Sequence, residues 1–338
     1  MKPTEVLIVE KRSALRVSGG YRYNDAVARE FRRRGVGGLA VVDRAEDLPD
    51  LAAQVLLIDS LLLDAPLPEA VAEALAARSC RLYILGHFFP PASPSLTKAE
   101  KATWVMSAQS WVRAAQGVAV TGYAALPLWQ RGFPDANFEI IPPAIVHRRR
   151  RTPPRNRPTK LITLGAITRD KLPLPLLRNV LDTTDGCDLI WHIVGSQIAD
   201  PQHVARTRDL IQDHSRRDCV MLRDAIAPSK TRGMLAGADI YLATSQFESF
   251  AMAAAEALAV GLPVVSFDVG DVRRWLSPEG GADLVTVGDF DTFAARVRAL
   301  VNPSTACTLS GHHAILPQTR WRNVGDQFQT YLNGAPSS

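Results

Sequence analysis

The sequence predicts an α/β protein made of two doubly wound domains, and three observations lead to this fold class. Short apolar runs alternate with helical patterns over most of the chain. A basic, proline-rich stretch near the middle divides this alternation into two series. The 338 residues are enough for two domains of ordinary size. Such alternation is typical of parallel sheets, because a crossover helix must follow each strand before the next can pair with it.

The first domain is expected in residues 1–146. Its buried strands are expected at residues 6–9, 39–42, 55–58, 82–85, 118–120 and 139–141. Between the first two strands, Tyr23, Val27 and Phe31 recur at intervals of four residues. This spacing indicates an amphipathic helix over residues 21–34 that ends at Gly35.

A linker is expected at residues 147–160, where arginines and prolines replace apolar residues. Such a composition favours an extended, solvated segment. The arginines could also contact nucleic acid, but no aromatic residue lies among them to stack on bases. The sequence therefore favours a surface linker and no nucleic-acid partner.

The second domain is expected in residues 161–318, and a C-terminal crossover helix with a tail in residues 319–338. The strands of the second series are expected at residues 161–165, 190–194, 220–222, 240–243, 264–267 and 284–287, and the last helix at 321–332. The two domains are expected to face each other across a cleft. Ligands of doubly wound proteins bind at the carboxyl ends of strands and between domains.

Composition excludes several classes of protein. Apolar residues form 46% of the chain and charged residues 22%, which excludes a wholly disordered chain. The net charge of +5 suits anionic ligands but is weak for a dedicated nucleic-acid binder. The four cysteines, Cys80, Cys187, Cys219 and Cys307, form no CxxC pair, so neither a zinc site nor a disulfide framework is indicated. A reducing cytoplasm fits, and with no apolar stretch of spanning length, at most peripheral membrane contact is expected.

The segment from Ile240 to Gly261 contains the strongest functional signal. A strand is expected to end near Thr244, and a short polar loop then leads into an alanine-rich helix. A helix start after a strand offers unpaired backbone N–H groups and the positive end of the helix dipole. This geometry suits an anion such as a diphosphate.

Two carboxylates flank this loop and helix. Glu248 is expected in the loop and Glu256 two turns into the helix, and eight residues of helix span about 12 Å. An extended nucleotide-sugar would fit this spacing, with sugar hydroxyls on Glu248 and ribose hydroxyls on Glu256, since carboxylates accept hydrogen bonds from diols. The alternative is that Glu248 is an ordinary exposed loop acid. Glu256 is harder to explain in that way, because its neighbours are almost all apolar.

Here the sequence resembles the family 4, or group 1, glycosyltransferases. The resemblance rests on Glu248-Ser249-Phe250, on Glu256 eight residues later, and on the following Gly261-Leu262-Pro263-Val264-Val265. It extends over most of residues 161–332. It implies the GT-B fold and transfer of a sugar from a nucleotide-sugar, UDP- or GDP-linked, to a hydroxyl acceptor. It further implies retention of anomeric configuration, no cofactor and no essential metal.

The resemblance also implies which residues act. Lys171 matches the family's lysine that faces the diphosphate of the donor, and with Glu248 and the backbone of Ser249, Phe250 and Ala251 it would bind that donor. In the first domain the match is weaker. Gly19 and Gly20 resemble the family's first glycine loop, although they could form an ordinary turn. His87, after the strand at 82–85, matches a histidine that faces the donor sugar, although a lone histidine is often structural.

Several positions depart from the family pattern. Ala166 stands where an arginine is usual, and nearby Arg169 could supply the missing cation or be a solvated loop residue. Ala251 replaces a common glycine. Asp271, Arg273 and Arg274 stand in place of a glycine, a proline and a glutamate.

Two further patterns are given structural interpretations. Asp289 and Asp291 form a D-x-D pattern that holds a metal in other glycosyltransferases, but they follow Gly288 at the start of an expected helix, where acids cap N–H groups. His312 and His313 lie in a polar turn and are expected at the surface.

Two alternative functions remain open from the sequence. A nucleotide-sugar 2-epimerase has the same architecture and needs no acceptor. A non-catalytic binding subunit would explain the alanines at 166 and 251. The sequence does not identify the donor sugar, the acceptor or the oligomeric state.

Overall fold

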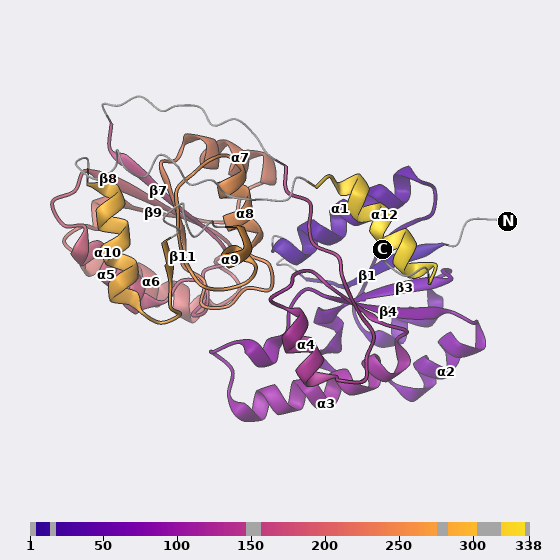
Figure 1. The fold of residues 1–338 in the computed structure, drawn as a ribbon. Helices are drawn as coiled ribbons and strands as arrows, with labels where there is room; N and C mark the ends of the chain where they lie inside the picture. The colour runs from indigo at the N-terminus through magenta and orange to yellow at the C-terminus, as the bar shows by residue number, and fades with distance from the viewer. Residues whose placement is uncertain (1–4, 14–17, 147–156, 276–282, 303–318, 335–338) are drawn as a thin grey trace. The chain divides into compact units, whose positions relative to one another are not determined.

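The protein consists of two compact units, each built around its own parallel sheet (Figure 1). The computed structural model describes residues 5–13, 18–146, 157–275, 283–302 and 319–334. One unit comprises residues 1–144 together with 319–338, and the other comprises residues 145–318. Both sheets have six parallel strands with helices on both faces, which confirms the predicted doubly wound α/β class.

The first sheet has the strand order β2-β1-β3-β4-β5-β6. Its strands are β1 (Val6–Lys11), β2 (Gly37–Val42), β3 (Val55–Asp59), β4 (Arg81–Gly86), β5 (Val118–Val120) and β6 (Phe138–Ile140). Its helices are α1 (Gly19–Arg33), α2 (Glu69–Ala77), α3 (Lys98–Ala114), α4 (Leu126–Gly132) and α12 (Trp321–Leu332), with short 3-10 turns η1 (Ala45–Asp50), η2 (Ser60–Asp64) and η3 (Pro90–Ala92). The chain adds β2 on one side of β1 and then β3 on the other side, so the strand order reverses between β1 and β3. In doubly wound folds, ligands bind at the carboxyl ends of the strands beside such a reversal.

Alternation along β3 shows how this sheet is covered. Val55 and Leu57 face one core that α1 and α12 close, whereas Leu56 and Ile58 face the opposite core with α2 and α3. All five residues of β3 are buried. A strand that is buried on both faces has a continuous apolar run and no alternation of apolar and polar residues. This is why β3 could be predicted from its apolar run alone.

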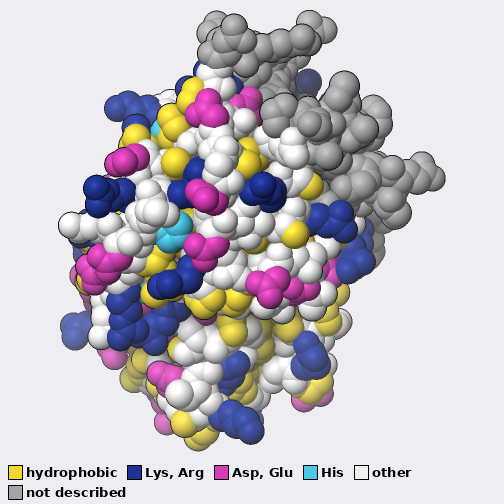
Figure 2. Space-filling model, turned by 90° about the vertical axis from the view of Figure 1, so that its left-hand side faces the viewer, with side chains coloured by type: hydrophobic (Ala, Val, Ile, Leu, Met, Phe, Trp, Pro, Cys, Tyr) yellow, Lys and Arg dark blue, Asp and Glu magenta, His cyan; other side chains and the backbone are white. Residues whose placement is uncertain are grey.

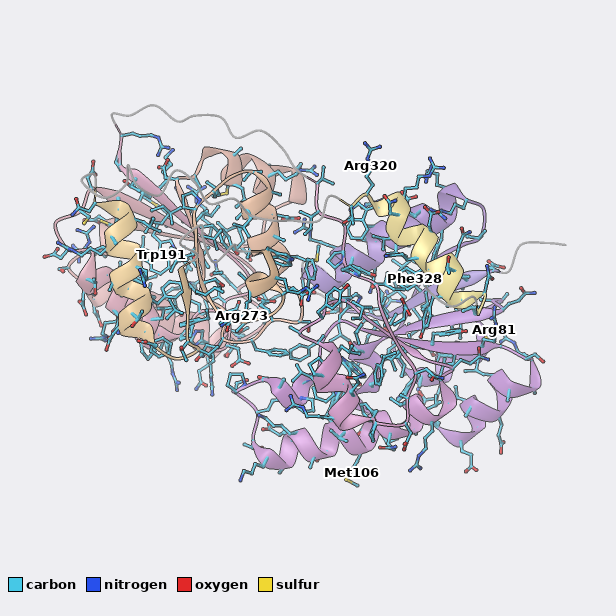
Figure 3. The ribbon with its side chains drawn as sticks, in the orientation of Figure 1. Arg81, Met106, Trp191, Arg273, Arg320 and Phe328 are labelled. Atoms are coloured by element: carbon cyan, nitrogen blue, oxygen red, sulfur yellow. The ribbon has the colours of Figure 1, made fainter. Side chains whose placement is uncertain are left out.

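The last helix, α12, belongs to the first unit (Figure 3). Phe328 is fully buried and makes edge-to-face ring contacts with Tyr23 and Phe31 of α1. At the end of α12, the Arg81 guanidinium donates to the Leu332 carbonyl at 2.6 Å. The helix thus holds α1 in place through aromatic packing.

The second sheet has the strand order β12-β11-β10-β7-β8-β9. Its strands are β7 (Thr159–Leu164), β8 (Leu189–Val194), β9 (Val220–Arg223), β10 (Ile240–Ala243), β11 (Val264–Phe267) and β12 (Asp283–Val285). Its helices are α5 (Leu174–Thr183), α6 (Pro201–Asp213), α7 (Pro228–Gly237), α8 (Met252–Ala259), α9 (Val272–Trp275) and α10 (Phe290–Val301), with the turn η4 (Arg217–Cys219). Trp191 of β8 is fully buried and donates its indole N–H to Thr163 at 3.0 Å (Figure 3).

The elements differ in detail from the sequence expectation. Strand β7 begins at Thr159, inside the stretch expected as linker. Arg157 is not a solvated linker arginine, since its guanidinium pairs with Asp239 at 2.8 Å and its side chain is only 16% exposed. The rest of the expected linker, at 147–156, and the expected surface histidines His312 and His313 lie outside the described residues.

Surface charge is mixed where the structure shows it. Figure 2 shows basic and acidic side chains interspersed over the viewed face rather than gathered by sign. Among the described helices, none is both long enough and apolar enough to span a bilayer. Met106 on α3 is an exposed apolar side chain (Figure 3).

Candidate active site

Lys171 and Glu248 meet at the carboxyl-terminal edge of the second sheet. The Lys171 ammonium lies 2.5 Å from Glu248 Oε1 and 3.5 Å from the Phe247 carbonyl. The side chains are 32% and 26% exposed, so the ion pair remains open to a ligand. The structure therefore brings together two residues that the sequence had selected separately, from loops that follow β7 and β10.

Two hydrogen bonds to backbone carbonyls join these two loops. The Gln246 N–H donates to the Asp170 carbonyl at 2.7 Å, and the Thr244 hydroxyl donates to the Lys171 carbonyl at 2.5 Å. Both contacts lie beside the ion pair. Both the backbone and the charged side chain of Lys171 are therefore held in place. This reduces the conformational entropy that Lys171 would lose when a ligand binds.

The loop from Glu248 to Ala251 leads into α8, which begins at Met252. Glu256 is the fifth residue of α8, so its expected place two turns into the helix is wrong, and the stretch from Glu248 to Glu256 is only partly helical. Ser249 and Phe250 are buried, and Glu256 is half-buried on a helix whose other residues are mostly in the core. Glu248, which pairs with Lys171, lies four residues before the start of this eight-residue helix.

Tyr241 on β10 connects the two glutamates electrostatically, and the sequence did not reveal it. The phenol is buried and donates to the Leu164 carbonyl at 3.3 Å. Burial first, and then the charges of Glu248 and Glu256, raise the pKa of Tyr241 far above its usual value. Both carboxylates therefore lie near one buried tyrosine.

The loop after β11 packs against the same segment. Gly270 has φ +59°, and a Cβ there would lie 2.9 Å from the Phe250 carbonyl carbon and 3.1 Å from Glu248 Cβ. The Asp271 N–H donates to the Phe250 carbonyl at 3.2 Å. Glycine at 270 is thus required by backbone conformation and by space. Arg273, one of the departures from the family pattern, is exposed and donates through Nε to Asp268 at 3.0 Å (Figure 3).

Arg169 is not placed on the Lys171–Glu248 pair. Its guanidinium lies 3.7 Å from Asp200 and 3.3 Å from the Gln202 side-chain oxygen, and its side chain is 56% exposed. Asp200 is the N-cap of α6 and accepts from the His203 N–H at 3.0 Å. The geometry thus favours Arg169 as a partner of the α6 terminus, while a cationic role toward a ligand stays a prediction.

Ala251 has a left-handed backbone, with φ 72° and ψ 54°. This explains why the family has glycine there, since a Cβ in this conformation costs about 1–2 kcal/mol. We expect Ala251→Gly to raise or preserve the thermal midpoint. The matched control is Ala255→Gly within α8, where the backbone is right-handed and glycine should destabilise by about 1 kcal/mol. Equal destabilisation by both changes, measured by thermal unfolding, would contradict the assigned strain.

A second polar site lies in the first unit, at the ends of β1, β3 and β4. Gly19 and Gly20 begin α1, and a Cβ on Gly20 would approach the His87 ring to 3.3 Å. His87 Nε2 lies 2.6 Å from Asn24 Oδ1. Burial lowers the pKa of His87, and the negative charge of Asp59 opposes that shift.

Asn24, Asp59 and Glu10 complete this network and were missed from the sequence. Asn24 Nδ2 donates to Asp59 at 2.7 Å and to Glu10 at 3.3 Å, and all three side chains are buried. The sequence did contain a signal for this site, since Glu10 and Asp59 directly follow the apolar runs 6–9 and 55–58. Charged residues are seldom fully buried without a function or a partner.

The D-x-D pattern is structural at its first position. Asp289 is the N-cap of α10 and accepts from the Thr292 N–H at 3.0 Å, as expected. That hydrogen bond lowers the pKa of Asp289. Asp291 instead accepts from the Asn179 side chain at 2.6 Å. Within the described ranges, no three His, Cys, Asp or Glu side chains are grouped as metal ligands.

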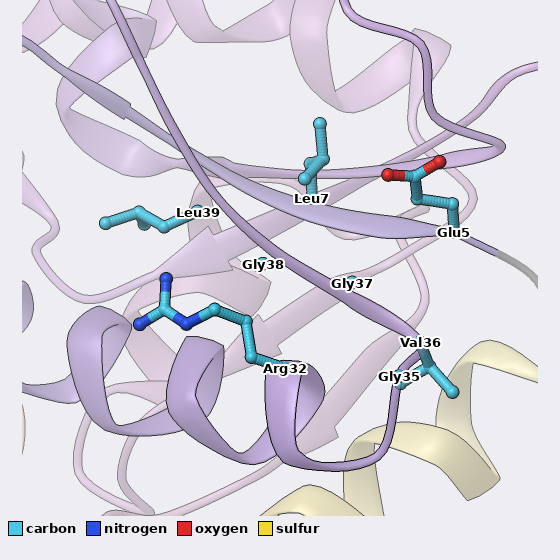
Figure 4. Close-up of a pocket in the computed structure, with 8 residues that line it drawn as sticks. All are labelled: Glu5, Leu7, Arg32, Gly35, Val36, Gly37, Gly38 and Leu39. Atoms are coloured by element: carbon cyan, nitrogen blue, oxygen red, sulfur yellow. The ribbon is translucent and has the colours of Figure 1, made fainter.

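A pocket of about 580 Å³ lies at the opposite end of the first sheet (Figure 4). Its lining residues are Glu5, Leu7, Arg32, Gly35, Val36, Gly37, Gly38 and Leu39. They surround the amino ends of β1 and β2, whereas the His87 network lies at the carboxyl ends. None of the predicted site residues lines this pocket.

The second unit matches a known protein family. Residues 158–303 match the family model described as glycosyl transferases group 1. Most of the second unit therefore matches the group 1 glycosyl transferases, which confirms the group 1 part of the resemblance found in the sequence.

Solved structures show the GT-B fold for the whole chain. Anabaena HepE, in complex with UDP and glucose, has a TM-score of 0.78 at 14% identity, over 98% of this chain and 99% of that one. Sucrose-phosphate synthase from Thermosynechococcus elongatus has a TM-score of 0.77 at 16% identity, over 98% of both chains.

A curated relative covers a smaller part. MMP alpha-(1->4)-mannosyltransferase of Mycolicibacterium hassiacum is 29% identical over 125 residues. The match spans 36% of this chain and 30% of that relative.

Proposed function

We propose that the protein is a retaining glycosyltransferase that moves a sugar from a nucleotide-sugar to a hydroxyl acceptor. The observation that supports this most strongly is the Lys171–Glu248 pair beside the start of α8, within a group 1 glycosyl transferase domain. A cation, a carboxylate and the N–H groups at a helix start suit the parts of a nucleotide-sugar, namely its diphosphate and its hydroxyls.

The difficult step is the departure of the nucleoside diphosphate, on which negative charge develops. The bond from the sugar's anomeric carbon to the phosphate oxygen breaks, and the acceptor oxygen bonds to the same face of that carbon. The acceptor's proton passes to the departing phosphate oxygen. Lys171 and the N–H groups of Ser249, Phe250 and Ala251 stabilise the developing charge, because preorganised donors act without rearrangement.

The other predicted residues have binding roles in this proposal. Glu248 accepts hydrogen bonds from sugar hydroxyls and Glu256 from the ribose. His87, Gly19 and Gly20 stay predicted contacts of the first unit with substrate.

The donor is proposed to be a UDP- or GDP-hexose. HepE was solved with UDP and glucose, and the curated relative is named a mannosyltransferase. A thermal-shift screen of UDP, GDP, ADP and TDP sugars tests this, because a ligand that binds the folded state raises its stability. Donor hydrolysis by the isolated chain would then support catalysis. A donor-induced shift without hydrolysis or transfer would favour the binding subunit, and conversion of the donor to its 2-epimer would favour the epimerase.

We further expect turnover to survive EDTA. The resemblance implies a metal-independent reaction, and the D-x-D acids cap α10 and bind Asn179. The measurement is the initial rate with and without EDTA, using the same donor. A complete loss of turnover that Mn²⁺ restores would contradict this prediction.

A further inference from the structure

The buried network at the carboxyl ends of β1, β3 and β4 fixes how an amide is oriented. Asn24 Nδ2 lies 2.7 Å from Asp59 Oδ2 and 3.3 Å from Glu10 Oε2. Asp59 Oδ1 accepts from the Leu61 N–H at 2.9 Å, so both oxygens of Asp59 act as acceptors. The amide atom that faces these acids must therefore be the NH₂ group.

The orientation of Asn24 in turn determines the proton on His87. Asn24 Oδ1 faces His87 Nε2 at 2.6 Å, and an amide oxygen can only accept. Nε2 must therefore bear a hydrogen. In a neutral imidazole, Nδ1 then has a free lone pair, and burial lowers the pKa of His87 toward that neutral form.

The His87 ring is held while Nδ1 stays available. A Cβ added at Gly20 would lie 3.3–3.4 Å from the His87 Cγ, Cβ and Cδ2 atoms, so the α1 backbone packs closely against this side chain. The centroids of the Tyr23 and His87 rings are 4.9 Å apart, in an edge-to-face arrangement. No hydrogen bond from the described part of the chain reaches Nδ1. His87 is half-buried, so one side remains open.

We propose that Asn24, oriented by Asp59 and Glu10, is a positioning residue that holds His87 as its neutral Nε2–H tautomer, so that Nδ1 accepts a hydrogen bond from a substrate hydroxyl. The identity of that hydroxyl as a sugar's rests on the proposed function. The tautomer itself does not, because it follows from the ligand-free network.

The tautomer is measured by long-range ¹H–¹⁵N NMR on the full ¹⁵N-labelled chain, with His87 signals assigned by their loss in His87→Ala. His203 is an internal reference, since its Nε2 lies 2.8 Å from the Leu172 carbonyl, which can only accept. We expect His87 to show the His203 pattern at neutral pH, with Nε2 protonated and Nδ1 bare. An Nδ1–H tautomer or a charged imidazolium would overturn the proposal.

Variants separate positioning from general stability. Asn24→Leu should abolish the slow exchange of the His87 Nε2–H proton and leave that of His203 unchanged. If Asn24→Leu does not fold, Asp59→Asn serves instead. The asparagine at 59 can still accept the hydrogen bond from the Leu61 N–H, but it no longer requires the Asn24 NH₂ group to face it. Exchange of the His87 Nε2–H proton should therefore accelerate. An unchanged His87 proton in the variant that folds would overturn the assignment.

A ligand titration tests the hydroxyl. UDP-glucose and GDP-mannose are the probes, and the one that binds should shift the His87 Nδ1 signal in the direction of hydrogen-bond acceptance while Nε2 stays protonated. Binding without any change at Nδ1 would contradict the acceptor role. If neither probe binds, the proposed donor class is contradicted, while the tautomer experiment still decides the role of Asn24.

Discussion

Replacing Lys171 by alanine is expected to lower kcat by about a hundred- to a thousand-fold, or about 2.7–4 kcal/mol. The usual arginine of the family is absent at Ala166, and Arg169 lies against Asp200 and Gln202. Lys171, and not Arg169, is therefore the cation that pairs with Glu248. The measurement is steady-state turnover with the donor that the thermal-shift screen selects.

Two control variants make this result specific. Lys230→Ala removes an exposed lysine from α7 of the same unit and should leave kcat unchanged. Arg169→Ala should have a much smaller effect than Lys171→Ala; if its effect is as large, Ala166→Arg should partly restore activity. The fold should survive Lys171→Ala, because Glu248 is 26% exposed and water can solvate it. Wild-type turnover by Lys171→Ala would show that the diphosphate site is wrongly assigned.

Replacing Glu256 by alanine is expected to weaken binding of the nucleoside diphosphate by about 10- to 150-fold. A hydrogen bond to a charged group contributes about 1.5–3 kcal/mol, and the ribose hydroxyls would lose one. Glu256 is half-buried on a helix whose other positions mostly face the core. Isothermal titration with UDP and with GDP gives the dissociation constants.

The matched control is Glu73→Ala, which removes an exposed glutamate from α2 of the first unit. Its dissociation constant should equal that of the wild type. Thermal unfolding should show both variants folded. A dissociation constant that Glu256→Ala leaves unchanged would rule out the ribose contact, even if turnover falls.

The positions of the strands were predictable because a parallel sheet buries both faces. Runs such as 6–9 and 55–58 are apolar without interruption, and no other environment in a globular protein favours them as strongly. Helix ends were marked by residues with definite backbone roles, such as Gly35, with φ +66°, after α1. The 3-10 turns were not predicted, because a single turn of helix is too short to show periodicity.

The sequence by itself determined the fold class and most strands, and it singled out some of the polar residues at strand ends. It selected Glu248 and His87 from their place after apolar runs together with the family resemblance, and Lys171 from the resemblance alone. Only the tertiary structure decided which of these residues meet. Lys171 and Glu248 lie 77 positions apart in the chain, and Asn24 and His87 lie 63 apart. Such pairings depend on the order of the strands and on the paths of the loops, and neither can be deduced from neighbouring residues in the sequence. In the sequence, Asn24 and Asp59 do not differ from ordinary exposed polar residues, and only the tertiary structure shows that they are buried.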